Sequence, residues 1–356
     1  IIEINKLKAI MRMKIFCMVV LCACLFIACE KDNDDYEPVK PPVEQPEKPV
    51  EPEKPDEPEK PDEPTTPPST DDIINFKIGD LNMIVGSNAW NAVAYGDGKY
   101  VAVGENGYVT MSTNGVDWNT PKQVGSNVWY AVAYANGKFV AVGGSGYSGQ
   151  KAFATYSTNG IDWATPVSIP SLYGDLSSIT YANGKFVAVG YHEYGGKDYG
   201  YITTSTDAVT WTSAIKIGED TETQLMAVTF GNGKFVAIGG GRITTSEDGI
   251  SWSALARISY DKFYSIVYAK DKFIICGTNT VIFTSADLVT FEQRFAKPGT
   301  SSLISVLYES GRIVALRSNG YYLLSENGID WSEPAQITDE SGNTVTAKLN
   351  GICAVH

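Results

Sequence analysis

The chain has little of what several classes of protein need. Its 356 residues include two histidines, His192 and His356, which are too few for a histidine metal site. Lys and Arg number 28 against 41 Asp and Glu, and no basic stripe occurs, which argues against a nucleic-acid partner. The sequence also lacks a phosphate loop and a nucleophile elbow. We therefore expect neither a metal nor a cofactor.

The apolar run near the start of the chain is too short to cross a bilayer as a helix. It extends from Ile15 to Ala28, whereas a membrane-spanning helix needs roughly twenty residues. Basic residues precede the run and acidic residues follow it, which is typical of a cleaved secretory signal. We expect residues 1–28 to hold this signal, with translation beginning at Met11 or Met13.

The expected signal ends at a cysteine. The segment Leu25-Phe26-Ile27-Ala28-Cys29 resembles a bacterial lipoprotein box, which implies that Cys29 receives a lipid and becomes the first mature residue. An ordinary signal cut at Ala28 is the alternative. Acidic residues directly after Cys29 resemble the export signal of some Gram-negative lipoproteins. That resemblance implies a lipid anchor in the outer membrane and exposure at the cell surface.

A proline-rich segment follows the cysteine. Pro38 to Pro68 holds twelve of the seventeen prolines, and from Pro49 to Pro64 one falls at every third position. Three residues per turn is the polyproline II period, which predicts an extended rod. Residues 30–72 also carry sixteen acidic and five basic side chains, so most of the net charge of −13 belongs to them. We interpret residues 29–72 as an acidic tether that holds a domain away from a membrane.

The remainder, residues 73–356, is built from a repeated unit. The first half of the unit is a β-rich run, a short turn that often contains Asn-Gly or Asp-Gly, and a second β-rich run, which predicts a hairpin. Its six copies occupy 92–104, 131–143, 178–190, 227–239, 265–277 and 305–317. Neither run shows much polar alternation, so these strands should be buried on both faces. Helix signals are absent.

The second half of each unit contains a seven-residue motif, which first reads STNGVDW at 112–118. Related segments lie at 157–163, 205–211, 246–252, 285–291 and 325–331. Its Ser hydroxyl and its Asn or Asp side chain can accept hydrogen bonds from backbone N–H groups ahead, and Gly eases a left-handed conformation. The motif resembles the Asp-box, or BNR, repeat of β-propellers, although the usual repeat has one more residue between Asp and Trp. We expect scaffold turns whose final aromatic packs against the neighbouring unit.

Resemblance and spacing together predict an all-β fold, a β-propeller of four-stranded antiparallel blades. Six units run from about Trp90 to Thr338. A seventh inner strand is expected at 348–355 and an outermost strand at 83–86, so that the two chain ends complete one split blade. We therefore predict seven blades, with six as the alternative.

Two cysteines, Cys276 and Cys353, belong to this domain. Both lie in apolar strand patterns, so we expect buried free thiols. A disulfide between them is the alternative, which is disfavoured because the repeat places them in different blades.

The repeat also predicts where a ligand would bind. In an up-and-down blade the hairpin turns and the seven-residue motifs share one face, so the loops after the second strands lie on the other face. There, two units carry long insertions, 144–153 and 191–201, which either form a site or are ordinary surface loops. Tyrosines offer flat apolar faces to sugar rings and hydroxyls to polar edges. The predicted ligand-binding residues are Tyr147, Tyr173, Tyr191, His192, Glu193, Tyr194, Tyr199 and Arg242.

These observations favour a non-catalytic, monomeric binding platform for glycan, with no catalytic residue assigned. The first alternative is a glycoside hydrolase that uses carboxylates near 191–222, which include Glu193, Asp198 and Asp220, together with Asp175. The second alternative is a protein-interaction platform in an outer-membrane complex.

Overall fold

The computed structural model describes residues 89–115, 117–145, 150–218, 224–298 and 300–337, and residues 344 and 350. All of them belong to one compact unit of the chain. The signal peptide, the lipidation site Cys29 and the tether that the sequence predicts all lie outside the described residues. No helix in the described part has the length and apolar character needed to cross a membrane.

The described strands form sheets of four, and within each sheet the strands pair antiparallel in chain order. Blade 1 consists of β1 (Trp90–Gly96), β2 (Lys99–Gly104), β3 (Tyr108–Ser112) and β4 (Lys122–Gln123). Blade 2 consists of β5 (Val128–Ala135), β6 (Lys138–Gly144), β7 (Lys151–Ser157) and β8 (Val167–Tyr173). Blade 3 consists of β9 (Asp175–Ala182), β10 (Lys185–Tyr194), β11 (Lys197–Ser205) and β12 (Ile215–Ile217).

Three further blades follow in the chain. Blade 4 consists of β13 (Ala227–Gly231), β14 (Lys234–Gly239), β15 (Arg242–Ser246) and β16 (Ala256–Arg257). Blade 5 consists of β17 (Phe263–Ala269), β18 (Lys272–Gly277), β19 (Ile282–Ser285) and β20 (Glu292–Phe295). Blade 6 consists of β21 (Leu303–Glu309), β22 (Arg312–Arg317), β23 (Tyr321–Ser325) and β24 (Ala335–Gln336). Two 3₁₀ turns, η2 (Glu105–Gly107) and η3 (Thr278–Thr280), join second strands to third strands in blades 1 and 5.

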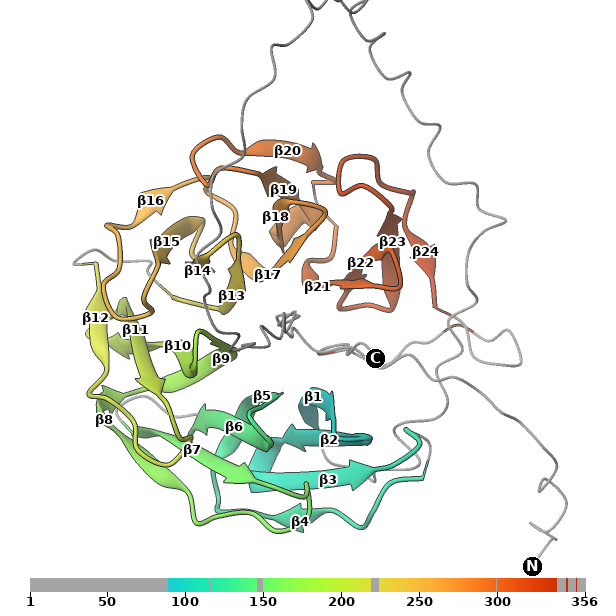
Figure 1. Cartoon of the computed structure of the whole chain (residues 1–356). Coiled ribbons are helices and arrows are strands. Elements are labelled where there is room, and N and C mark those ends of the chain that lie inside the picture. The colour runs from blue at the N-terminus through green and yellow to red at the C-terminus, as the bar shows by residue number, and fades with distance from the viewer. Residues whose placement is uncertain are drawn as a thin grey trace, which may run out of the picture. The chain divides into compact units, whose positions relative to one another are not determined.

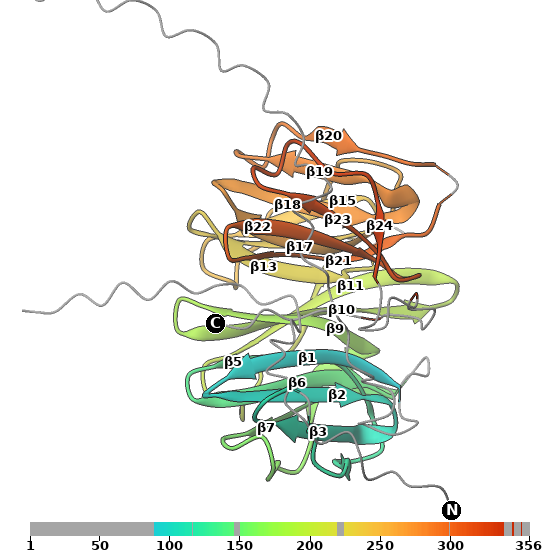
Figure 2. The same ribbon diagram turned by 90° about the vertical axis from the view of Figure 1, so that its right-hand side faces the viewer.

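The six sheets are the blades of a β-propeller (Figure 1). The first strand of each blade is innermost, and β1, β5, β9, β13, β17 and β21 pack against one another in chain order. Figure 2 shows the same blades from the side. The prediction of an all-β propeller with four-stranded antiparallel blades is therefore confirmed.

The number of blades matches the six-blade alternative and not the prediction of seven. Among the described residues there are six sheets, each drawn from one continuous repeat unit. The predicted seventh blade would have come from two short segments at the chain ends, 83–86 and 348–355. Both lie outside the described residues, apart from Asn350.

Asn350 nevertheless contacts blade 1 in a way that the repeat explains. Its side-chain Nδ2 donates a hydrogen bond to the carbonyl of Trp90 over 3.0 Å. Asn91 makes the corresponding bond to the carbonyl of Trp129 in blade 2, over 3.1 Å. The hydrogen bond from Asn350 to blade 1 is therefore equivalent to the hydrogen bond from Asn91 of blade 1 to blade 2.

The inner hairpins are packed so closely that some positions accept only glycine. At Gly190, which ends the regular part of an inner hairpin, a Cβ atom would lie 1.9 Å from the carbonyl oxygen of Asp175. At Gly143, in the same position of blade 2, a Cβ would lie 1.9 Å from the carbonyl oxygen of Val128. These distances are far below van der Waals contact, which explains why the strand sequences end in glycine.

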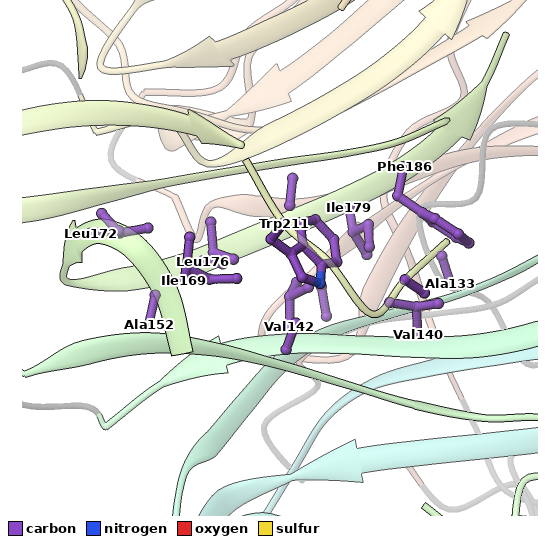
Figure 3. Close-up of a cluster of buried hydrophobic side chains, with 14 residues drawn as sticks. Ala133, Val140, Val142, Ala152, Ile169, Leu172, Leu176, Ile179, Phe186 and Trp211 are labelled. Carbon is purple, nitrogen blue, oxygen red and sulfur yellow. The ribbon is translucent and has the colours of Figure 1, made fainter. Parts of the chain in front are cut away.

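The hydrophobic cores lie between adjacent blades. The cluster drawn in Figure 3 joins Val140 and Val142 of β6 with Ile179 and Phe186 of blade 3. Trp211, the last residue of the third seven-residue motif, packs into this cluster and is 6% exposed. The expectation that the motif aromatic packs against the neighbouring unit is confirmed here.

The hydrogen bonding expected of the seven-residue motif is also present. In the first copy, Ser112 Oγ accepts bonds from the backbone N–H groups of Asn114 and Gly115, over 3.2 and 2.9 Å. Asn114 Oδ1 accepts a bond from the backbone N–H of Asp117 over 2.8 Å. The Trp118 indole then donates to the carbonyl of Gly115 over 3.2 Å. The turn satisfies its own polar groups, as a scaffold element should.

Hairpin turns of one blade contact the motif of the next. Lys138 Nζ in blade 2 donates to the backbone carbonyl of Asp207 in blade 3, over 2.7 Å. Lys185 of blade 3 makes the same bond to Asp248 of blade 4. The two kinds of turn therefore share one face of the propeller, as predicted.

Cys276 is a buried free thiol. Burial raises the pKa of this thiol, so it stays protonated at neutral pH. The prediction of a free thiol is confirmed for Cys276, whereas Cys353 lies outside the described residues.

Candidate functional site

The segment 191–201 was expected to be a surface loop, and it is instead the far end of a β-hairpin. β10 continues to Tyr194 and β11 begins at Lys197. The turn between them consists of Gly195 and Gly196, whose φ angles of 62° and 75° fit a tight two-residue connection. The insertion therefore lengthens two strands of blade 3 beyond those of the other blades.

Strand alternation divides the side chains of this hairpin between its two faces. One face carries His192, Tyr194, Tyr199 and Tyr201, as the pairing of β10 with β11 requires. The opposite face carries Tyr191, Glu193 and Asp198. Residues that are neighbours in the sequence therefore cannot all face one ligand.

The outer strand β8 of blade 2 faces the first of these surfaces, and it is irregular. Its pairing with β7 shifts along the strand, and Ser171 adopts a left-handed φ of 61°. Ile169 and Leu172 are both buried in the core of Figure 3 although they are three positions apart. Irregular pairing of this kind changes the direction of the side chains around it. Ser171 and Tyr173 are exposed as a result.

A pocket of about 560 Å³, open to solvent, lies where β8 meets the strands β10 to β12. Its lining consists of Ser171, Tyr173, His192, Tyr194, Tyr199, Tyr201 and Lys216. The volume falls in the range of sites that hold small ligands. Tyr173 and Tyr194 are 53% and 73% exposed, so their rings are accessible to a ligand. None of the described lining residues carries a carboxylate.

The polar groups of the pocket are largely uncommitted. Lys216 Nζ lies 3.7 Å from the centre of the Tyr199 ring, a cation–π contact. The rings of His192 and Tyr194 lie 6.0 Å apart. Beyond such ring contacts, the described part of the chain gives no hydrogen bond or ion pair to the tips of these side chains or of Tyr173 and Tyr201. A ligand can therefore bond to them without displacing a protein partner.

A second set of polar residues lies on the opposite face of the hairpin and near the inner strands. Tyr191 pairs with Asp175 of β9. Burial, and then the charge of Asp175, raise the pKa of Tyr130 to about 12, and the same two causes raise the pKa of Tyr191. Both hydroxyls therefore stay protonated at neutral pH. Among the described residues, no group of three or more His, Cys, Asp or Glu is placed to hold a metal ion.

The structure brings together four of the predicted site residues, namely Tyr173, His192, Tyr194 and Tyr199. Tyr191 and Glu193 lie on the other face of the hairpin, because the segment is a strand and not a loop. Arg242 lies at the start of β15 in blade 4 and does not line the pocket. Tyr147 lies outside the described residues.

Sequence reasoning missed three residues of the pocket, Ser171, Tyr201 and Lys216. Tyr199 and Tyr201 alternate in the run KDYGYITTS, so a strand assignment would have placed both on one face. Lys216 pairs with Tyr201 through a three-residue outer strand that no sequence signal marks. Ser171 lines the pocket because β8 pairs irregularly with β7, and no feature of the sequence predicts this irregularity.

Comparison with known proteins supports the fold. No protein-family model and no curated protein sequence matches the chain. Among solved structures, "YCF48 bound to D1 peptide" is 16% identical with a TM-score of 0.53, over 74% of this chain and 85% of that one. Virginiamycin B lyase from Staphylococcus aureus is 11% identical with a TM-score of 0.58, over 71% of this chain and 86% of that one. YCF48 from Cyanidioschyzon merolae is 16% identical with a TM-score of 0.52, over 75% and 90%. At these identities the likeness establishes a β-propeller and nothing about ligands.

Proposed function

We propose that this protein is a cell-surface lipoprotein whose β-propeller binds glycan, without catalysis, in the pocket between blades 2 and 3. The observation that carries the proposal is the lining of that pocket, which combines four tyrosines with a histidine, a serine and a lysine. Aromatic faces supply apolar area for the C–H faces of sugar rings, and hydroxyl and nitrogen tips supply partners for sugar hydroxyls.

The pocket favours binding over hydrolysis. A glycoside hydrolase of the usual kind needs two carboxyl groups across the scissile bond. The described lining residues have none, and Glu193 and Asp198 lie on the opposite face of the hairpin. Incubation with a bound oligosaccharide should therefore release no reducing sugar. Release that disappears in Glu193→Gln or Asp175→Asn would instead support the hydrolase alternative.

The first test is binding of the purified chain to a glycan array, followed by calorimetry with the best ligand. Tyr194→Ala and Tyr173→Ala should each weaken binding about fivefold to tenfold, since each removes a stacking face worth about 1 kcal/mol. Tyr260→Ala is the matched control, because Tyr260 is 90% exposed and lies outside the pocket. An array without any bound glycan, or equal losses in all three variants, would contradict the proposal.

A second candidate is binding of a peptide or protein, the platform alternative. One of the similar solved structures is YCF48 bound to D1 peptide, and this peptide complex of a similar protein supports the candidate. The same tyrosines would then contact peptide side chains. Recovery of a stable protein partner from membranes, lost in Tyr194→Ala but not in Tyr260→Ala, would favour this candidate.

Attachment to the outer membrane through Cys29 is the remaining part of the proposal. Its support is the lipoprotein-like segment before Cys29 and the acidic proline-rich tether after it. Cells grown with labelled palmitate should incorporate label into the wild-type chain and not into Cys29→Ser. Protease added to whole cells should then remove the propeller if it is exposed. Label retained in Cys29→Ser would refute lipidation at this residue.

A further inference from the structure

We propose that the pocket selects acidic glycans, meaning sugars that carry a carboxylate or sulfate group, and that Lys216 recognises the charged group. This inference rests on the proposed glycan binding and names the class of ligand. It concerns a residue in the short strand β12, where nothing in the sequence marks a site.

The first support is that Lys216, unlike several other lysines of the domain, has no oxygen partner among the described residues. Several of those lysines have an oxygen partner: Lys138 with Asp207, Lys185 with Asp248, Lys122 with Asp162 and Lys297 with Glu333. Lys216 contacts the face of the Tyr199 ring, and within the described residues it has no hydrogen bond or ion pair. The N–H donors that do not face the ring are therefore available to an oxygen of the ligand.

The second support is the way in which the fold aims Lys216 at the pocket. The next residue, Ile217, is buried on the other side of β12, in the core that blade 3 shares with blade 4. Alternation then places Lys216 on the pocket side, opposite Tyr201 of β11. The contact with Tyr199 restricts the side chain further, so less conformational entropy is lost when a ligand binds.

The third support is the balance of charge in the lining. The described lining residues provide one ammonium group, that of Lys216, and no carboxylate to neutralise it. An anionic group on a sugar would form a charge-assisted hydrogen bond with Lys216, which is stronger than a bond between neutral groups. The exposed rings of Tyr173 and Tyr194 remain for the sugar rings on either side.

The test uses the purified full-length chain on an array of matched pairs. Each uronic-acid oligosaccharide is paired with its carboxyl-reduced form, and each sulfated oligosaccharide with its desulfated form. The acidic member should bind at least about tenfold more tightly, and the difference should shrink at high NaCl concentration. Whichever acidic class binds identifies the source of the anionic group.

Substitutions then assign the preference to Lys216. Lys216→Met should lose about tenfold in affinity for the acidic member and much less for the neutral member, so that the preference disappears, while Lys216→Arg should keep the preference. Lys270→Met is the matched control, because Lys270 also lies near a tyrosine ring, 5.6 Å from that of Tyr308, but outside the pocket. Equal binding of both members of every pair, or a preference that survives Lys216→Met, would overturn the inference and leave glycan binding intact. Absence of binding to every glycan would overturn the proposed function itself.

Discussion

The seven-residue turns and the pocket use similar side chains in opposite ways. In the turns, Ser, Asn and Asp side chains bond to the backbone of the same motif, and the same bonds recur around the ring. In the pocket, the tips of tyrosine, histidine and lysine side chains have no such partner among the described residues. The polar side chains of the turns therefore stabilise the fold, whereas those of the pocket are available to bind a ligand.

The contrast follows from repetition. A contact that recurs in every unit serves what every unit needs, which is a stable blade joined to its neighbours. The pocket forms where two blades depart from the repeat. Blade 3 has a longer hairpin, and blade 2 has an irregular outer strand, β8. Four predictions test this division between support and binding.

The largest effect should come from Trp211→Ala. Trp211 is 6% exposed in the core between blades 2 and 3, so truncation leaves a cavity. We expect the free energy of unfolding to fall by about 3–5 kcal/mol, measured by urea denaturation followed by circular dichroism. A loss below about 1 kcal/mol would show that the motif aromatics do not support the core.

A smaller loss is expected for Ser205→Ala in the same motif. Ser205 Oγ accepts bonds from the N–H groups of Asp207 and Ala208, over 3.3 and 2.9 Å. Removing the hydroxyl leaves these buried or partly buried donors without their acceptor, so we expect about 1–2 kcal/mol of destabilisation by the same assay. Glycan binding should be unchanged at temperatures where the variant is folded. Weaker binding by the folded variant would assign the turns a part in the site.

Tyr194→Ala should leave stability almost unchanged. Its ring is 73% exposed at the end of the hairpin and supports no core. Substitutions at such positions change the free energy of unfolding by less than about 0.5 kcal/mol. The effect on binding described above should then appear without an effect on stability. A loss of stability as large as that of Ser205→Ala would mean that the pocket tyrosines are structural.

The smallest effect at neutral pH is expected for Asp207→Asn, because the Asn copies of the motif make the same bonds. The N–H groups of Thr210 and Val209 hold the charged form of Asp207 and lower its pKa to about 2. Since this value is below the usual pKa of about 4, Asp207 stabilises the fold above pH 4 and loses that contribution as the pH falls toward 2. The melting temperature of Asp207→Asn should therefore fall less steeply than that of wild type over this interval. Parallel curves would contradict the assigned bonding.

Repetition also decides how much the sequence could predict. The hairpin turns, the scaffold motif and the two-sided burial of the inner strands each occur in several copies. A pattern that recurs so often does not arise by chance, so the sequence predicts the propeller fold. The site has one copy. Reading 191–201 as a loop grouped Tyr191 and Glu193 with His192 and Tyr194, whereas strand alternation separates them. The number of blades depended on chain-end segments outside the regular repeat.

The positions of Lys216 and Ser171 in the pocket could not be predicted from a single sequence. Each reaches the pocket through a contact between neighbouring strands, β11 with β12 for Lys216 and the irregular β7–β8 pair for Ser171. Pairing of short outer strands is decided by tertiary packing, which leaves no periodic signal in the residues themselves.

Hydroxyl-radical footprinting of the purified chain, with and without its best array glycan, tests the central division most directly. Binding in the pocket should protect Tyr173 and Tyr194 from oxidation and leave the tryptophans of the seven-residue turns unchanged. Protection of Trp118 or Trp163 with no protection of the two tyrosines would contradict this account.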